Sequence, residues 1–132
     1  MKELIKRFEG LRLKAYRCAA GVWTIGWGHT AGVTAGMKIT EAEAERLLDE
    51  DLRPVVAALP PGLSDNQRAA LASLCFNIGV SAFLRSTIRR KVCANPADPS
   101  IAAEFLRWKY SRGRELPGLL KRRRAEAEVY MS

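Results

Sequence analysis

The hydrophobic positions at the start of the chain recur at helical spacing and then give way to a shorter alternation. Four apolar residues share one helix face: Met1, Leu4, Ile5 and Phe8. Gly10 follows them and predicts the end of this helix. From residue 13 to residue 33, short runs of aromatic and β-branched residues alternate with glycines. This pattern predicts a hairpin or a three-stranded sheet with a turn at residues 19–21.

The rest of the chain predicts helices. Thr40 and Glu43 can form a capping box ahead of a helix that runs to about residue 58, and Ser64 and Gln67 can form another ahead of an apolar central helix. That central helix should end near residue 78, and further helices are expected over residues 82–92, about 98–110 and 117–130. The fold class is therefore α+β. We expect one domain, with a helix and β segment over about 1–38 and a helical lobe over about 39–132.

Charge is distributed unevenly along the chain. The net charge is +8, and residues 85–132 carry twelve Lys and Arg against five Asp and Glu, whereas residues 1–84 are nearly balanced. Such a field attracts polyanions, which include nucleic acid, anionic lipid and the acidic polymers of a cell wall. No apolar run reaches the ~20 residues of a membrane span, and the N-terminus has no signal-peptide core. We therefore expect no signal peptide or anchor, and a chain that accumulates where it is made.

The three cysteines form no paired spacing of the C-x-x-C type, which favours a reducing compartment. Cys75 and Cys93 lie among apolar residues, so both are expected to be small buried side chains. Cys18 lies in a polar turn instead.

Glu9, Cys18 and Thr24 are the candidate catalytic residues. Hydrolysis of a glycosidic bond needs a proton donor and a second group that activates water or attacks the sugar. Glu9 falls at the C-terminus of the first helix, where the partial negative charge disfavours an ionised carboxylate and so favours the proton-donating form.

The interval from Glu9 to Cys18 and from Cys18 to Thr24 resembles the pattern of the phage-type lysozymes, the endolysins of glycoside hydrolase family 24. That pattern is Glu, eight residues, Asp or Cys, five residues, Thr. Three further segments resemble the family in the same order: the opening helix and first strand over residues 8–16, the sequence at residues 76–79, and the closing helix at residues 118–126. The resemblance implies a lysozyme-like fold, with a small N-terminal hairpin or three-stranded sheet packed on a mainly helical lobe.

The resemblance also implies a function and a site. Members hydrolyse the β-1,4 bond between N-acetylmuramic acid and N-acetylglucosamine in peptidoglycan and so lyse the host cell. By position, Glu9 would be the general acid, Cys18 the base or nucleophile, and Thr24 the residue that helps to hold water. No cofactor and no metal are expected. The enzyme would be a monomer that waits in the host cytoplasm, needs a separate holin-like membrane permeabiliser, and acts on the peptidoglycan layer and the anionic cell envelope, with no nucleic acid as partner.

The role of Cys18 stays open between two mechanisms. A thiol titrates near 8.5, and the neighbouring Arg17 can lower the pKa of Cys18. The thiolate can activate water, as the aspartate does in relatives that invert the anomeric configuration, or it can attack the sugar and retain that configuration.

Other conspicuous residues are assigned structural roles. His29, the single histidine, is expected to tie the sheet to an acidic residue of the helix after Thr40. Trp23 and Trp27 should share one strand face and belong to the core rather than to a sugar-stacking surface.

The basic run at residues 121–124 is expected to divide its roles. One of Arg122 and Arg123 should point inward to pair with Glu9 or another acid of the first helix, while the remaining basic side chains attract the anionic wall.

Three alternative functions remain. A lytic transglycosylase needs only the glutamate and would leave an anhydro product on the same bond. A cationic module that binds the wall or a membrane would owe its action to the C-terminal third, with weakened catalysis. Nucleic-acid binding ranks last, because only charge supports it and no recognition motif is present.

Overall fold

The computed structural model describes residues 1–132, which form two compact units. Residues 5–53 make up one unit, called here the β unit, and residues 1–4 with 54–132 make up the other, called the helical unit. Two helices, α1 (Lys2–Glu9) and α2 (Glu41–Ala58), have residues in both units. No helix is both long and apolar enough to cross a bilayer.

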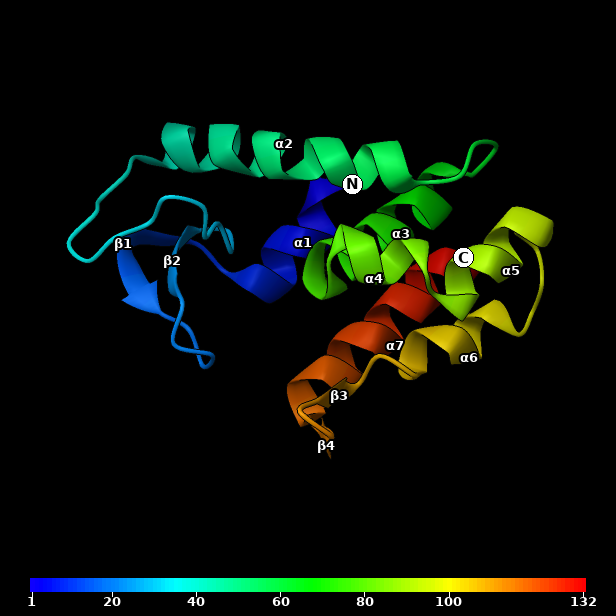
Figure 1. Cartoon of the computed structure of the whole chain (residues 1–132). Helices are drawn as coiled ribbons and strands as arrows, with labels where there is room; N and C mark the ends of the chain where they lie inside the picture. Colours follow the sequence, from blue (N-terminus) through cyan, green and yellow to red (C-terminus); the bar gives the residue numbers. More distant parts are fainter. The chain divides into compact units, whose positions relative to one another are not determined.

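The β unit is built around an antiparallel hairpin of β1 (Arg12–Arg17) and β2 (Trp23–Gly26), drawn in blue in Figure 1. Tyr16 pairs with Thr24 in its register. Residues 37–39 add a short third segment, since the Ala15 N–H donates to the Met37 carbonyl at 2.9 Å. The predicted hairpin and its turn are confirmed. The third segment lies beyond residues 13–33, where the sheet was expected.

The helical unit is organised on α3 (Asp65–Ile78) and α7 (Pro117–Met131), which pack against each other (Figure 1). Six successive residues of α3 are buried, over 70–75, so this helix forms the predicted apolar centre. Its start is the predicted capping box: the Ser64 hydroxyl accepts from the Gln67 N–H at 3.1 Å, and the Gln67 side chain accepts from the Ser64 N–H at 2.9 Å. The equivalent box of Thr40 and Glu43 precedes α2. The α+β fold class is confirmed.

Two local predictions in the helical unit need correction. The helix expected over 82–92 is two helices, α4 (Val80–Leu84) and α5 (Thr87–Ala94), because the Ser86 hydroxyl caps α5 by accepting from the Arg89 N–H at 3.2 Å. The next helix, α6 (Ile101–Leu106), is shorter than expected at both ends. It starts late because Asp98 accepts from the Ser100 N–H at 2.9 Å and holds a turn there.

A small hairpin follows α6 that the sequence reading missed. It consists of β3 (Tyr110–Ser111) and β4 (Arg114–Glu115), joined by a two-residue turn in which Arg112 and Gly113 both have positive φ angles of 52° and 76°. An Arg-Gly turn lacks the Asn-Gly or Asp-Gly signature of such hairpins, which is why the pattern gave no warning. Arg112 is the only non-glycine residue in this conformation.

Candidate active site

Glu9 is placed by the end of the first helix. It is the last residue of α1 and is half-buried. Gly10 then adopts φ 70° and donates its N–H to the Lys6 carbonyl at 3.0 Å. A left-handed glycine after a helix closes its last turn and lets the chain reverse. The chain enters β1 only two residues later, so Glu9 lies at the junction of helix and sheet.

Cys18 is held in the turn that joins β1 to β2. Its carbonyl accepts from the Gly21 N–H at 2.8 Å, and its own N–H donates to the Val22 carbonyl at 3.0 Å. Gly21 reaches the φ of 79° that this turn requires, which a residue with a side chain would adopt only with strain. The half-buried thiol is therefore fixed by backbone hydrogen bonds on both sides of the turn.

The environment of this turn favours the thiolate. Backbone hydrogen bonds from Val22 and then Ala20 hold the pKa of Cys18 below its usual value, and a side-chain hydrogen bond from Thr24 acts in the same direction. Arg17, expected to supply this effect, is not among the causes; its guanidinium lies over the Trp23 ring, 5.3 Å from the centroid. The expected direction of the shift is thus confirmed, but its source is the backbone rather than a cation.

Thr24 links the turn to β2. The residue is 4% exposed, and its hydroxyl donates to the Val22 carbonyl at 3.0 Å. A hydroxyl carries a single hydrogen. It can therefore serve either that carbonyl or the Cys18 sulfur, and a charged sulfur is the stronger acceptor. Thr24 and Cys18 are brought together by the structure as the sequence pattern predicted.

His29 has the structural role that the sequence indicated. Its Nδ1 lies 2.8 Å from Oδ2 of Asp51, on the helix after Thr40, and its Nε2 lies 2.8 Å from the Ala31 carbonyl oxygen. Both ring nitrogens face an acceptor, so both must carry a hydrogen to use both contacts. The ring ties the loop after β2 to α2.

The two tryptophans of this segment have different environments. Trp27 is 7% exposed and belongs to the core, as predicted, with the Lys6 ammonium 4.3 Å from its ring centroid. Trp23 is only half-buried. The strand alternation that should place both on one face stops at Gly26, where φ becomes 65° and β2 ends.

In the helical unit, Arg122 and Arg123 both point inward. Their exposures are 5% and 0%, and each pairs with the fully buried Glu126, Arg122 at 3.3 Å and Arg123 at 2.8 Å. Burial raises the pKa of Glu126, while Arg123, Ser73 and Arg122 act against that rise. The expected division between one inward and one outward arginine is wrong: helical spacing leaves Lys121 and Arg124 at the surface instead. A pairing of either arginine with Glu9 stays a prediction.

The cysteines outside the turn differ from each other. Cys75 is buried, as expected, and burial raises its pKa to about 11. Cys93 is exposed, contrary to expectation, because it lies on the outer side of the short helix α5. All three cysteines are free thiols.

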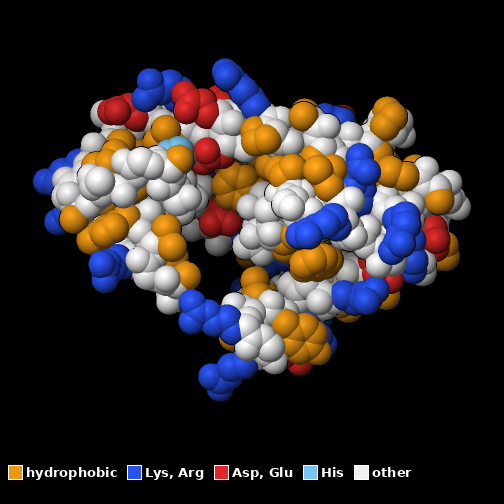
Figure 2. Space-filling view, in the orientation of Figure 1, with side chains coloured by type: hydrophobic (Ala, Val, Ile, Leu, Met, Phe, Trp, Pro, Cys, Tyr) orange, Lys and Arg blue, Asp and Glu red, His pale blue; other side chains and the backbone are white.

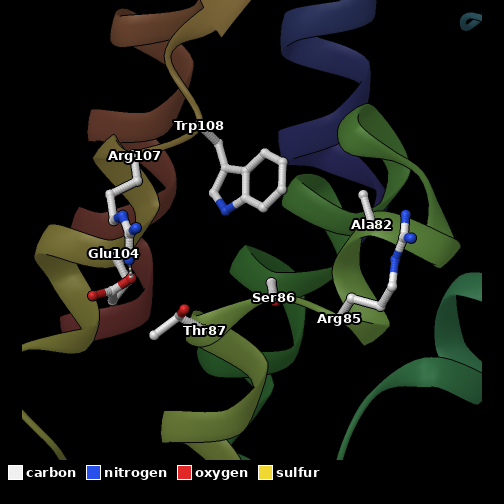
Figure 3. A pocket seen from close by; sticks show the side chains of 7 residues that line it. All are labelled: Ala82, Arg85, Ser86, Thr87, Glu104, Arg107 and Trp108. Atoms are coloured by element: carbon white, nitrogen blue, oxygen red, sulfur yellow. Dashed lines mark hydrogen bonds and ion pairs between the residues drawn. The ribbon is translucent and has the colours of Figure 1, made fainter.

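A separate hollow of about 380 Å³ lies wholly within the helical unit. In Figure 3 the Trp108 indole projects into it, with Glu104 and Arg107 on one side and Ala82 and Arg85 on the other. Glu104 accepts from Lys91 and Arg107, each at 3.1 Å, which holds its pKa low despite the opposing effect of burial. None of the residues predicted to be catalytic lines this hollow.

Comparison with known proteins decides the family. The family model described as phage lysozyme matches residues 6–126. The chain belongs to this phage lysozyme family. It is 48% identical to an endolysin of Acyrthosiphon pisum secondary endosymbiont phage 1, over 98% of this chain and 93% of that protein. It is 44% identical to the endolysin of Salmonella phage P22, over 97% and 92% of the two chains.

A solved structure gives the same answer for the fold. The muramidase domain of SpmX from Asticaccaulis excentricus superposes with a TM-score of 0.87 at 37% identity, covering 98% of this chain and 93% of that domain. The fold is therefore lysozyme-like, as the resemblance implied. The protein is a phage lysozyme, a glycoside hydrolase that lyses peptidoglycan.

Proposed function

We propose that Glu9, Cys18 and Thr24 perform the hydrolysis, at the β-1,4 bond between N-acetylmuramic acid and N-acetylglucosamine. Glu9 gives its proton to the oxygen of the leaving sugar. Cys18, as thiolate, supplies the second catalytic group, and the Thr24 hydroxyl helps to hold the reacting water. All three residues lie inside the segment matched by the family model. They stand at the Glu, Cys and Thr places of the pattern read in the sequence.

The observation that carries this proposal is the lowered pKa of Cys18. A cysteine kept only for structure gains nothing from hydrogen-bond donors around its sulfur, whereas a reactive one must be ionised to work. Here the donors are fixed by the turn itself, mainly from Val22 and Ala20. The turn therefore favours the charged form of the sulfur at the place where an aspartate would offer a charged oxygen.

The thiolate can act by two routes that differ in their products. As a base it takes a proton from water, whose oxygen bonds to the anomeric carbon as the glycosidic bond breaks, and the configuration inverts. As a nucleophile the sulfur bonds to that carbon as the glycosidic bond breaks and Glu9 protonates the leaving oxygen. Water, giving its proton to the Glu9 carboxylate, then displaces the sulfur as thiolate, so the configuration is retained. The anomer of the first product, recorded by NMR, identifies the route.

Variants of the two acidic groups test the proposal. Glu9→Gln should lower hydrolysis of purified peptidoglycan by a factor on the order of 10²–10⁴, because it removes the proton donor. Glu50→Gln, an exposed position on α2, is the matched control and should leave the rate unchanged. Cys18→Asp should retain hydrolysis with inversion. Cys18→Ser should lose it, since a hydroxyl stays protonated.

Two outcomes would contradict this function. A dominant anhydro-muramyl product, one water lighter by mass spectrometry, would indicate a lytic transglycosylase. Lysis by Glu9→Gln at the wild-type rate would indicate membrane action by the cationic surface instead.

Release and location belong to the proposal as well. We propose that the enzyme waits in the host cytoplasm, reaches the peptidoglycan with the help of a separate holin-like protein, and is drawn to the anionic envelope by its basic C-terminal third. Expression in host cells with and without a membrane permeabiliser tests this. Lysis that needs no permeabiliser would contradict it.

A further inference from the structure

A second cavity in the helical unit has a lining suited to an amide group. Its volume is about 310 Å³. Apolar side chains from the ends of α3 and α7, Ile78 and Leu119, form part of its wall, and the rest comes from Asn77, Trp108 and the hairpin strand β3. None of Glu9, Cys18 and Thr24 contributes to it.

The orientation of the Asn77 amide is fixed by a hydrogen bond from Arg123. The Arg123 Nη2 donates to Asn77 Oδ1 at 2.9 Å. A guanidinium has only donors, so this contact requires the carbonyl oxygen of Asn77 to face Arg123. Arg123 cannot turn away, because it is fully buried and its Nε lies 2.8 Å from Glu126 Oε1. The Asn77 NH₂ group therefore faces the cavity side, where the residue is exposed.

The free polar atoms of this cavity are chiefly donors. The NH₂ of Asn77 makes no hydrogen bond with the protein. The hydroxyls of Tyr110 and Ser111 also lack protein partners and can donate. Donors without partners, next to apolar and aromatic walls, match a ligand that offers a carbonyl oxygen beside nonpolar carbon.

We propose that this cavity binds an amide group of the peptidoglycan chain, with the Asn77 NH₂ donating to its carbonyl oxygen and Arg123 acting as the positioning residue. The proposal rests on peptidoglycan being the substrate. The acetamide of a wall sugar and the peptide bonds of a stem peptide share this chemistry, and the experiment separates the two sources.

Asn77→Asp is the decisive variant, because it changes the outward group from donor to acceptor and keeps an oxygen for Arg123. Its KM for soluble peptidoglycan fragments should rise about tenfold with kcat nearly unchanged, as expected for a lost hydrogen bond replaced by repulsion. Asn66→Asp makes the same substitution in the first turn of the same helix, lines neither cavity, and should leave KM unchanged. An unchanged KM in Asn77→Asp, or an equal rise in Asn66→Asp, would overturn the proposal.

A binding measurement makes the test independent of hydrolysis. The Asn77 side-chain amide gives its own ¹⁵N–¹H signals, assigned by their absence in Asn77→Asp. In the Glu9→Gln protein these signals should shift with a peptide-free oligomer of N-acetylglucosamine if the sugar acetamide binds, or with a free stem peptide if the peptide binds.

If the Asn77 signals shift with neither ligand, the proposal that this cavity binds an amide group is refuted. A shift in the Glu9→Gln protein, combined with a wild-type enzyme that fails to hydrolyse peptidoglycan, would instead refute the proposed function and leave the binding site standing. Arg123→Lys, which keeps the charge but loses the guanidinium geometry, should weaken the Asn77 signal shift while Asn77 itself remains.

Discussion

The two units of this lysozyme assemble their polar side chains in different ways. In the β unit, Glu9, Cys18 and Thr24 come from one short stretch of chain, and backbone hydrogen bonds of a turn hold the latter two. In the helical unit, Ser73 and Glu126 meet across 53 positions, and both are fully buried. The first arrangement leaves Glu9 and Cys18 partly exposed, whereas the second excludes water from charged groups that must then satisfy one another.

This difference separates the groups proposed for catalysis, in the β unit, from the buried ion pairs that stabilise the helical unit. A catalytic group must reach solvent and substrate, so a rigid local turn is a suitable holder for it. A buried ion pair is instead costly to break, because one charge is left without compensation. Changes in the β unit should therefore alter reactivity with little loss of stability, and changes in the buried network should do the reverse.

The largest effect is expected in the buried network. Glu126→Gln leaves Arg122 and Arg123 without a buried anion, so the free energy of unfolding should fall by about 3–5 kcal/mol. Urea denaturation measures this change. Glu128→Gln, an exposed site on the same helix, should change stability by less than about 0.5 kcal/mol. Similar losses in the two variants would remove the distinction between the units.

A smaller loss of stability is expected when the contact between His29 and Asp51 in the β unit is weakened. Asp51→Asn removes the charged acceptor of the His29 Nδ1–H, and the free energy of unfolding should fall by about 1–3 kcal/mol. Thermal unfolding is the measurement, with Glu50→Gln as the exposed neighbour for reference. A larger loss here than for Glu126→Gln would mean that the β unit also depends on a buried charge.

Binding to the wall should depend on the exposed charge of the helical unit. Arg112 and Arg114, at the tip of the β3–β4 hairpin, are exposed and make no ion pair, and Figure 2 shows Lys and Arg side chains at this projecting end. Replacing both by Ser in the Glu9→Gln background should weaken sedimentation with intact walls roughly threefold to tenfold at low salt.

The matched control replaces two exposed arginines of α2, Arg46 and Arg53, by Ser. It therefore has the same net charge as the hairpin double variant. Equal weakening in the control would show that total charge, not the hairpin, attracts the wall. In high salt the two double variants should converge with the parent protein, since screening removes the attraction.

The smallest effect concerns the thiol itself. Because hydrogen bonds hold the pKa of Cys18 low, its alkylation by iodoacetamide should reach half its maximal rate at a lower pH than that of an ordinary thiol. Thr24→Val removes one of the lowering contacts, so that midpoint should move to higher pH. The assay uses a Cys93→Ser background, and Cys75 stays protonated because burial raises its pKa to about 11. A midpoint that does not move would exclude a hydrogen bond from Thr24 to the sulfur.

Helix starts were predicted correctly where the residues that cap the helix lie close together in the sequence. Both capping boxes formed as predicted because each is completed within four residues, at Thr40 and Glu43 and at Ser64 and Gln67. The final helix began at Pro117, where a proline fits the first turn. The split at Ser86 was missed, since a serine inside an apolar pattern caps a helix only when the chain already turns there.

The functional residues also fall into those that local sequence reveals and those that it does not. The pattern of Glu9, Cys18 and Thr24 could be read directly, and their roles remain proposals. Asn77 lies in residues 76–79, a segment that resembles the family, but nothing in the sequence shows that Arg123 sets the direction of its amide. That contact spans 46 positions, and no local pattern encodes it.

The sequence by itself determined the α+β class, the family, the main helices and the short stretch that carries the catalytic candidates, because each depends on neighbouring residues. Only the tertiary structure decided that both Arg122 and Arg123 are buried, that backbone donors rather than Arg17 lower the pKa of Cys18, and that Cys93 is exposed. These outcomes depend on which distant segments approach each side chain and on how much water they exclude.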